Sequence, residues 1–465
     1  MSNTQLTLES DAIELPNGTR NSHPLLTDAI TKQFLKLAFP IIIALMINGL
    51  YNFVDAIFIT RGVGINAMAS VSAVFPINMF IISVSAMLGS GMAAIISRRL
   101  GSGDKLGASQ VFGSSLLFSI AIGFSLSTLL YLLRFHIYQL LVLPQELLID
   151  ADAYLVPILL ITTVTFASGT LTESFRAVGK PKDMMKVMLL GSLLNIIFDA
   201  LFIFVFEWGV PGAAWATVLA MLCSFSLAVI LQRDGNDRLQ LSRENCRLSF
   251  NIHRQVVSLG FPIFLSHSGF AFTIAVTIFA VTKYSGSDAS LLISAHGLII
   301  RSFMLLFLPL LGMTIALQTL ASYNFGAGQL QRVKASFFTA VTIGTIWTAS
   351  ISLLLVFKPQ WLLQLFTDDI LLIETASNIS SIVFLAFITA AVGMMCSTLF
   401  QSMGKALPAM LLETIRTYIL LPMIVILPIW LGVKGIWWAF PITDVIGMTI
   451  AVLFTGYYFK NKLKR

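Results

Sequence analysis

The sequence predicts an all-α integral membrane protein with twelve transmembrane helices in two six-helix lobes, related by a pseudo-two-fold axis along the membrane normal. The composition, a series of long apolar stretches and an internal repeat predict this fold. Of the 465 residues, 57% are hydrophobic and 11% are charged, and the mean hydropathy is +0.88. A soluble domain carries about 25% charged residues. Such a chain cannot cover itself with polar surface, so we expect the lipid bilayer to be its solvent.

Twelve stretches are long and apolar enough to cross a bilayer, which takes about 20 mostly apolar residues. They are expected near 35–59, 68–97, 110–133, 152–175, 184–206, 210–232, 255–282, 290–320, 333–357, 371–401, 406–430 and 435–459. The longest internal polar stretch separates the first six from the last six. The expected domains are a polar cytoplasmic segment at 1–33, an N-lobe at 34–232, a cytoplasmic linker at 233–254, a C-lobe at 255–459 and a basic cytoplasmic tail at 460–465.

The two halves of the chain repeat short motifs at a nearly constant offset. LAFPI at 37–41 returns as LGFPI at 259–263, and FRAVGK at 175–180 returns as FQSMGK at 400–405. Gly101 and Gly103 likewise return as Gly326 and Gly328 in the second half. Matches at one offset indicate an internal duplication. Because each half holds an even number of spans, both have the same orientation, and the axis that relates them runs along the membrane normal.

Lys and Arg residues fall between the apolar stretches and favour one side of the membrane. With the amino terminus in the cytoplasm, most of them lie on that side, including Arg98, Arg99, Arg176, Arg332 and the run at 233–254, so we expect both termini there. The net charge of +7 does not indicate nucleic-acid binding, because these cations are not gathered on one folded face. The first thirty or so residues lack the apolar core of a signal peptide, so the first span is expected to direct insertion.

Two aspartates lie inside otherwise apolar spans, where an ionisable side chain needs a partner or a function. Asp55 is in the first span with Tyr51 one turn before it, and Asp199 is in the fifth span with Asn195 one turn before it. Both spans run outward and both aspartates lie nearer the outer end, so we expect them at similar depth. Two carboxyl groups with amide and hydroxyl neighbours predict a proton relay or a small-cation site. The alternative is that both are merely hydrogen-bonded to structural neighbours.

Several motifs, in order along the chain, resemble the MATE family of multidrug and toxic-compound extrusion transporters. They are VDAIFIT after Pro40, LGSGDKLGA, FRAVGKPKDMM, LLNIIFDALFIF and ALQTLASYNFGAGQLQRVK, and the resemblance extends from about residue 34 to 458. The resemblance implies export of bulky, often cationic and amphipathic compounds by alternating access between the lobes, driven by a cation gradient. It also implies a monomer in the bacterial inner membrane.

The sequence is most similar to the DinF-like branch of that family, which places its coupling site for H⁺ or Na⁺ in the N-lobe. The matching positions, which the resemblance implies as cation-coupling residues, are Tyr51, Asp55, Asn195, Asp199 and Thr217. All of them except Tyr51 are candidate Na⁺ ligands. Pro40 matches the proline at which the first helix of that branch is thought to bend. No cofactor beyond the coupling ion is expected.

The C-lobe holds a different set of polar residues. Other branches of the family use a glutamate in the seventh span, where this chain has His267 and no acid. Arg301 in the eighth span and Asp444 in the twelfth lie at similar depth, so they could pair. These three residues are candidates for structural roles or for substrate contact. Glu413 and Arg416, three residues apart, are expected to form a local ion pair.

Two other classes of function compete with drug export. A lipid-linked oligosaccharide flippase or polysaccharide exporter of related fold would need a strongly cationic cavity, whereas the in-span charges of the N-lobe are mainly acidic. An intramembrane enzyme would need a nucleophile with a base, or a metal cluster, and the spans show neither. Cys223, Cys246 and Cys396 have no metal-binding spacing. No nucleotide-binding loop occurs, so the energy for transport is expected to come from an ion gradient.

Overall fold

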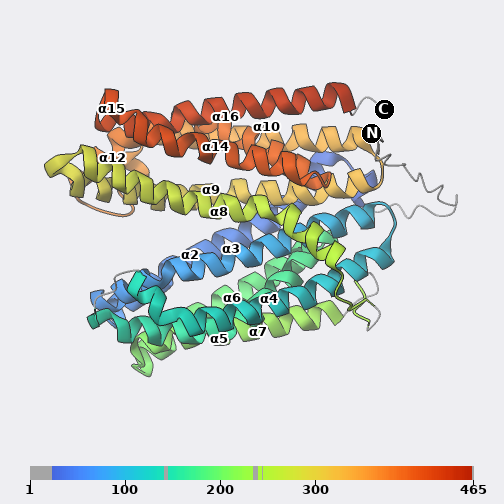
Figure 1. The fold of residues 1–465 in the computed structure, drawn as a ribbon, viewed down its shortest axis with the longest axis horizontal. Coiled ribbons are helices and arrows are strands. Elements are labelled where there is room, and N and C mark those ends of the chain that lie inside the picture. The colour runs from blue at the N-terminus through green and yellow to red at the C-terminus, as the bar shows by residue number, and fades with distance from the viewer. Residues whose placement is uncertain (1–23, 141–144, 234–238, 243–244, 463–465) are drawn as a thin grey trace, which may run out of the picture.

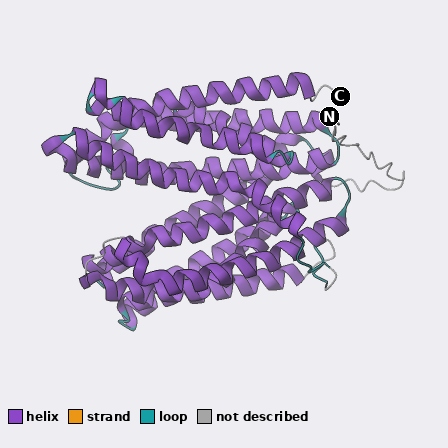
Figure 2. Ribbon diagram, viewed as in Figure 1, coloured by secondary structure: helices purple, strands orange, loops and turns teal. Residues whose placement is uncertain are grey.

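The computed structural model describes residues 24–140, 145–233, 239–242 and 245–462, and the regular structure in these residues is entirely helical (Figure 2). The helices of the first half are α1 (Pro24–Thr27), α2 (Ile30–Gly62), α3 (Ile65–Gly101), α4 (Lys105–Leu140), α5 (Gln145–Ala177), α6 (Pro181–Ala200), the π-helix η1 (Leu201–Val205) and α7 (Gly209–Arg233). Those of the second half are α8 (Phe250–Tyr284), the 3₁₀ turn η2 (Gly286–Asp288), α9 (Ala289–Gly326), α10 (Leu330–Phe357), α11 (Gln360–Leu363), α12 (Ile370–Val383), the 3₁₀ turn η3 (Phe387–Thr389), α13 (Ala390–Ser402), α14 (Ala406–Ile426), α15 (Pro428–Leu431) and α16 (Val433–Lys462).

Parts of three predicted segments lie outside the described residues. They are most of the polar segment predicted at 1–33, several residues of the linker predicted at 233–254, and the end of the basic tail predicted at 460–465.

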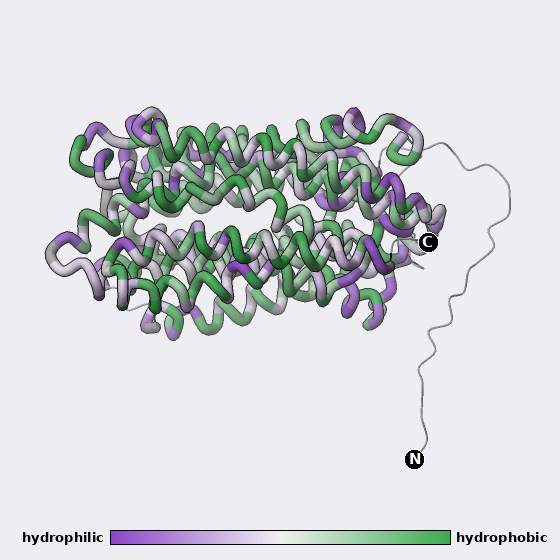
Figure 3. Tube along the Cα trace, turned by 90° about the horizontal axis from the view of Figure 1, so that it is seen from above, coloured by the Kyte–Doolittle hydropathy of each residue, from purple (hydrophilic) through white to green (hydrophobic). Residues whose placement is uncertain are grey.

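Among the described residues, eleven helices are each long and apolar enough to cross a membrane. A twelfth span is broken, because Ile370–Val383 and Phe387–Ser402 meet at an angle of 51°. This agrees with the twelve predicted spans. Several helices run well past the predicted limits, and α9 reaches 38 residues. Seen from above, hydrophobic residues fill the middle of the helices and hydrophilic ones gather toward their ends (Figure 3).

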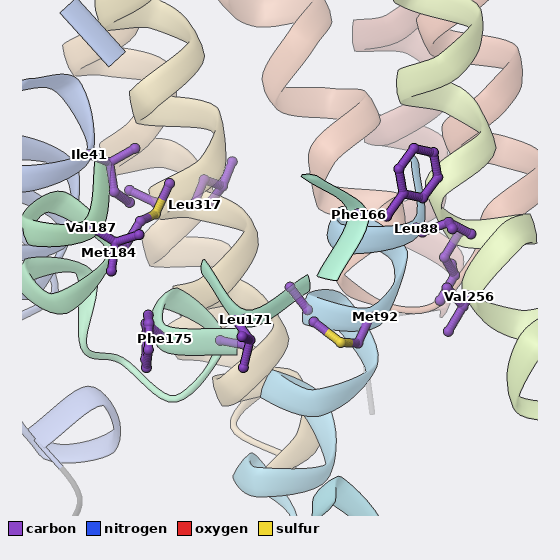
Figure 4. Packing of buried hydrophobic residues seen from close by; sticks show 14 of the residues in the cluster. Ile41, Leu88, Met92, Phe166, Leu171, Phe175, Met184, Val187, Val256 and Leu317 are labelled. Carbon is purple, nitrogen blue, oxygen red and sulfur yellow. The ribbon is translucent and has the colours of Figure 1, made fainter. Parts of the chain in front are cut away.

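The two halves form two lobes that lie side by side in Figure 1, with α2 to α7 in one and α8 to α16 in the other. They meet where α3 packs on α8 and α9, and where α2 packs on α9. We call this contact surface the seam. A buried apolar cluster continues across it, and in Figure 4 Ile41 of α2 and Met184 of α6 lie close to Leu317 of α9. Apolar packing therefore joins the lobes along the seam.

The first span begins on the same side of the bundle as the last span ends (Figure 1). Arg332, at the start of α10, donates to the carbonyl oxygen of Asp28 just before α2, and the Lys334 ammonium lies 5.7 Å from the Phe459 ring near the end of α16. We call this side the terminal end of the bundle and the opposite side the far end. An even total number of spans follows from this placement, as the sequence predicts.

At the terminal end, α3 and α9 cross with backbone directly against backbone. A Cβ atom on Gly101 would meet the carbonyl oxygen of Tyr323, and one on Gly326 would meet the carbonyl oxygen of Arg98. The repeat offset that relates Gly101 to Gly326 also relates Arg98 to Tyr323. The two contacts are therefore equivalent under the pseudo-two-fold axis, and both need a residue without a side chain.

Gly101→Ala and Gly326→Ala should each destabilise the protein, because the added methyl group must push two helix backbones apart. We expect the free energy of unfolding to fall by about 1–3 kcal/mol, as measured by SDS titration of the purified protein in mixed micelles. Gly297→Ala on α9 is the matched control, since its Cβ would meet no atom within 4 Å and alanine is favoured in a helix. Equal stability of the Gly101 and Gly297 variants would contradict the close crossing.

Candidate functional site

Two carboxyl groups from different helices meet in the N-lobe. Asp55 lies two turns before the end of α2, and Asp199 lies in the last turn of α6, which packs on α2. The two carboxyl groups are within hydrogen-bonding reach of each other. Asp199 is fully buried, and Asp55 is partly exposed. The structure thus brings together the two in-span aspartates that the sequence singles out.

Several oxygen atoms at this pair have no donor among the described residues. They are one carboxylate oxygen of Asp55, both carboxylate oxygens of Asp199 and the amide oxygen of Asn195, and all are buried. Buried polar atoms in proteins almost always have a hydrogen-bond partner. Two adjacent carboxylates also repel each other unless a proton or a cation lies between them. An acceptor-only cluster of this kind fits a proton or a small hard cation.

Neutral groups from α6 and α7 complete the cluster. The Asn195 amide donates from Nδ2 to the Thr217 hydroxyl oxygen at 3.1 Å, and this hydroxyl donates to the Ala213 carbonyl oxygen at 3.1 Å. The amide nitrogen of Asn195 is thereby occupied, and its oxygen is left as an acceptor. The Tyr51 phenol of α2 lies close enough to interact electrostatically with both carboxyl groups. All five predicted cation-coupling residues therefore lie in one neighbourhood.

A π-helix begins two residues after Asp199 and packs against the end of α2. Phe204 of this η1 turn contacts Phe58 edge-to-face with a ring-centroid distance of 5.3 Å. A Cβ on Gly62 would collide with the side chains of Ile203 and Phe204. π-Helical turns within α-helices are often found at functional sites. Here the turn fixes the end of α6 against α2, and so helps to position Asp199 beside Asp55.

Sequence reasoning missed two features, one at this site and one at the seam. Tyr154 of α5 is 8% exposed and lies close enough to both carboxyl groups to interact with them electrostatically. Arg176, which sequence patterning placed among the loop cations, is 1% exposed, forms an ion pair with Glu173 and donates to the Thr319 hydroxyl across the seam at 3.5 Å. An in-span tyrosine and an acid three residues before the arginine were the available signals.

Pro40 is buried inside α2, and the helix runs unbroken through it. Its ring nitrogen carries no hydrogen, so the carbonyl group of Lys36 lacks its usual partner in the helix. The structure therefore offers a weak point at Pro40, and bending there remains a prediction.

In the C-lobe, the predicted pairing of Arg301 with Asp444 is wrong. Asp444 of α16 forms an ion pair with Arg416 of α14 through the guanidinium Nε atom, and α14 and α16 pack together. Arg301 is exposed and has no ion-pair partner among the described residues. Arg301 and Asp444 lie at similar depth along their spans, but α14, which packs on α16, presents Arg416 at the level of Asp444.

The local ion pair expected between Glu413 and Arg416 is also replaced by this contact. Arg416 is committed to Asp444, which is 5% exposed, and the Glu413 carboxyl group lies within hydrogen-bonding reach of the Ser266 and Ser397 hydroxyls. His267 is exposed on α8. No group of three or more metal-ligating side chains occurs within the part of the chain that the structure describes.

Comparison with known sequences identifies relatives over nearly the whole chain. The MatE family model matches residues 40–201 and 262–426, one segment in each lobe. The multidrug export protein MepA of Staphylococcus haemolyticus (strain JCSC1435) is 22% identical over 435 residues, which cover 94% of this chain and 95% of that protein. MepA of Staphylococcus aureus (strain NCTC 8325 / PS 47) is 23% identical over 436 residues, with 93% and 95% covered.

Solved structures show the same fold. The crystal structure of MATE in complex with MaL6 aligns with a TM-score of 0.89 at 23% identity, over 96% of this chain and 100% of that one. The outward-facing conformation of a multidrug resistance MATE family transporter of the MOP superfamily aligns with a TM-score of 0.88 at 24% identity, again over 96% and 100%. The arrangement of helices in the two lobes is therefore shared with these proteins.

Proposed function

Because the chain belongs to the MATE family of multidrug efflux transporters, we propose that it exports bulky amphipathic, often cationic compounds in exchange for H⁺ or Na⁺ bound at Asp55 and Asp199. The family makes it a transporter and not an enzyme. Its relatives MepA, which are multidrug export proteins, support the substrate class. They disfavour the alternative of a lipid-linked oligosaccharide flippase.

The observation that carries the coupling proposal is the group of buried acceptor oxygens at Asp55, Asn195 and Asp199 that have no donor among the described residues. A bound cation or proton would supply what these oxygens lack. In H⁺ coupling, one carboxyl group would carry the proton and donate it in a hydrogen bond to the other. In Na⁺ coupling, the carboxylates with the Asn195 and Thr217 oxygens would be the ligands. Both schemes use the same residues.

Coupling requires that ion and substrate favour different states of the protein. In the proposed cycle, substrate is accommodated while the carboxyl pair is deprotonated or holds Na⁺. Protonation from outside rearranges α2 about Pro40, narrows the N-lobe and releases the substrate. The N-lobe site, together with the lack of an acid in the sequence FPIFLSHSGFAF around His267 of α8, supports the assignment to the DinF-like branch.

The same proposal sets the topology. The terminal end carries Arg98, Arg99 and Arg332, and Lys and Arg residues accumulate on the cytoplasmic side of membrane proteins. We therefore assign the terminal end to the cytoplasm and the far end to the outside of a bacterial inner membrane. The working unit is proposed to be a monomer.

Everted membrane vesicles with a fluorescent cationic dye supplied on their outer side, which is the cytoplasmic face, test the function and identify the coupling ion. Efflux coupled to H⁺ predicts that an imposed pH gradient drives dye movement and that a Na⁺ gradient at equal pH does not. Coupling to Na⁺ predicts the opposite result. Vesicles that carry the Asp55→Asn/Asp199→Asn double variant are the control. Dye movement that ignores both gradients would overturn the proposed antiport.

A further inference from the structure

The short segment before α2 is tied to the C-lobe at the terminal end. Arg332, in the first turn of α10, donates to the carbonyl oxygens of Leu25 at 3.3 Å and Asp28 at 2.7 Å. The Asn324 amide, near the end of α9, donates to the same Leu25 carbonyl oxygen at 3.2 Å. The Leu25 side chain is 3% exposed within the apolar cluster that crosses the seam. The segment is thus held by both its backbone and a buried side chain.

The two C-lobe residues form a preassembled site. Arg332 also donates from Nε to the Asn324 side-chain oxygen at 3.0 Å, and Asn324 is 0% exposed and donates to the Leu320 carbonyl oxygen at 2.8 Å. Each side chain therefore holds the other in place before the segment binds. On the side of α2, the Gln33 amide donates to the Asp28 carboxylate at 2.6 Å. A continuous chain of hydrogen bonds thus links α9 and α10 to the first turn of α2.

The contact is not a consequence of the internal repeat. The positions that the repeat offset relates to Asn324 and Arg332 are Arg99 and Gly107 in the N-lobe. Arg99 is paired with Asp104, and Gly107 has no side chain to donate. The site therefore exists in the C-lobe alone, where it receives the start of the N-lobe polypeptide.

We propose that Asn324 and Arg332 are a docking site for residues 25–28 that clamps the two lobes together at the terminal end, and that this end opens only when the clamp releases. The bond from Arg332 to Asp28 is short and charge-assisted, a class about twice as strong as neutral hydrogen bonds. Other polar contacts between the lobes, such as Ser114 with His253 at 3.0 Å, Ser90 with Gln318 at 3.1 Å and Arg176 with Thr319 at 3.5 Å, are longer than this bond. The clamp thus adds a specific polar lock to the apolar packing of the seam.

The clamp also lies on the helix that carries the coupling site. Residues 25–28 lead directly into α2, which holds both Pro40 and Asp55. A rearrangement of α2 caused by the carboxyl pair would therefore pull on the clamped segment, and release of the clamp would free the start of α2. This link to transport rests on the proposed function, whereas the clamping of the lobes does not.

Spin labels at Lys182→Cys and Leu407→Cys would measure the opening of the terminal end. These residues start α6 and α14, are exposed, and are related by the repeat, so their separation reports the distance between the lobes. The full chain would be labelled after replacement of Cys223, Cys246 and Cys396 by serine, and studied by double electron–electron resonance in nanodiscs. Arg332→Ala should raise the ratio of long to short distances roughly tenfold, because several hydrogen bonds across the seam are lost.

Asn324→Ala should shift the ratio of long to short distances in the same direction. This variant tests the clamp if the Arg332 variant does not fold. Lys334→Ala is the matched control, since it removes a charge from the same turn of α10, and the Lys334 ammonium lies over the Phe459 ring of α16. Distance distributions of the Arg332 and Asn324 variants that coincide with that of the parent would overturn the clamp, as would an equal shift caused by Lys334→Ala. The measurement needs no transport, so dye efflux that ignores both ion gradients would refute the antiport and leave the clamp standing.

Discussion

Asp199→Asn should abolish dye efflux while the protein still folds and reaches the membrane. Asparagine has nearly the same shape as aspartate, but it cannot exchange a proton and is a poor ligand for a cation that needs charge compensation. Its new amide hydrogens can donate to the Asp55 carboxylate oxygen that has no partner among the described residues. We therefore expect efflux to fall by at least about tenfold, while the thermal stability of the purified protein stays equal or rises.

Asp55→Asn should give the same loss of efflux, because the two carboxyl groups act as one site. Asp183→Asn is the matched control: it lies on the same helix as Asp199 but at its start, where it pairs with the exposed Lys186. This variant should retain most of the efflux rate. Normal efflux by either Asp55→Asn or Asp199→Asn would contradict the coupling assignment, and so would an equal loss by Asp183→Asn. Opposite changes in efflux and stability separate a coupling role from a structural one.

The lobes, the spans and the carboxyl pair could be predicted because they depend on properties that sequence records directly. Hydropathy and length determine which segments cross a membrane, and the repeat determines how the halves are related. The meeting of Asp55 and Asp199 followed from equal depth in two outward-running spans, together with the resemblance to a family. That several of their carboxylate oxygens have no donor among the described residues could not be predicted, because hydrogen bonding depends on which donors approach within about 3 Å.

The contacts of the C-lobe and the seam show where such reasoning ends. Arg301 and Asp444 have matching depth, but α16 turns Asp444 toward α14 and therefore toward Arg416. Arg332 read as one of the loop cations that set topology, although its guanidinium group is occupied by Asn324 and two backbone carbonyl oxygens. Rotation about a helix axis and the choice of neighbouring helices decide such contacts, and neither is encoded in a local pattern.

Arg416→Leu should destabilise the protein by about 3 kcal/mol, measured as the free energy of unfolding in SDS titration. The Asp444 carboxylate is 3% exposed, so removal of its guanidinium partner leaves a buried charge that must be neutralised or left unpaired. Arg416 itself is 46% exposed, which places the expected cost at the lower end of the range for buried ion pairs. The loss of stability therefore comes mainly from the Asp444 carboxylate, which is left buried without a partner.

The double variant Arg416→Leu/Asp444→Leu distinguishes this cause from lost packing. Removing both charges leaves no unpaired group, so the double variant should be more stable than Arg416→Leu alone. Arg301→Leu is the control, because that side chain is exposed and has no ion-pair partner among the described residues, and its effect should stay within about 0.5 kcal/mol. If Arg301→Leu costs as much as Arg416→Leu, the ion pair of the C-lobe has been assigned to the wrong arginine. A double variant with a lower free energy of unfolding than either single variant would contradict this cause. It would mean that the two side chains stabilise the lobe by packing and that the Asp444 charge does not depend on Arg416.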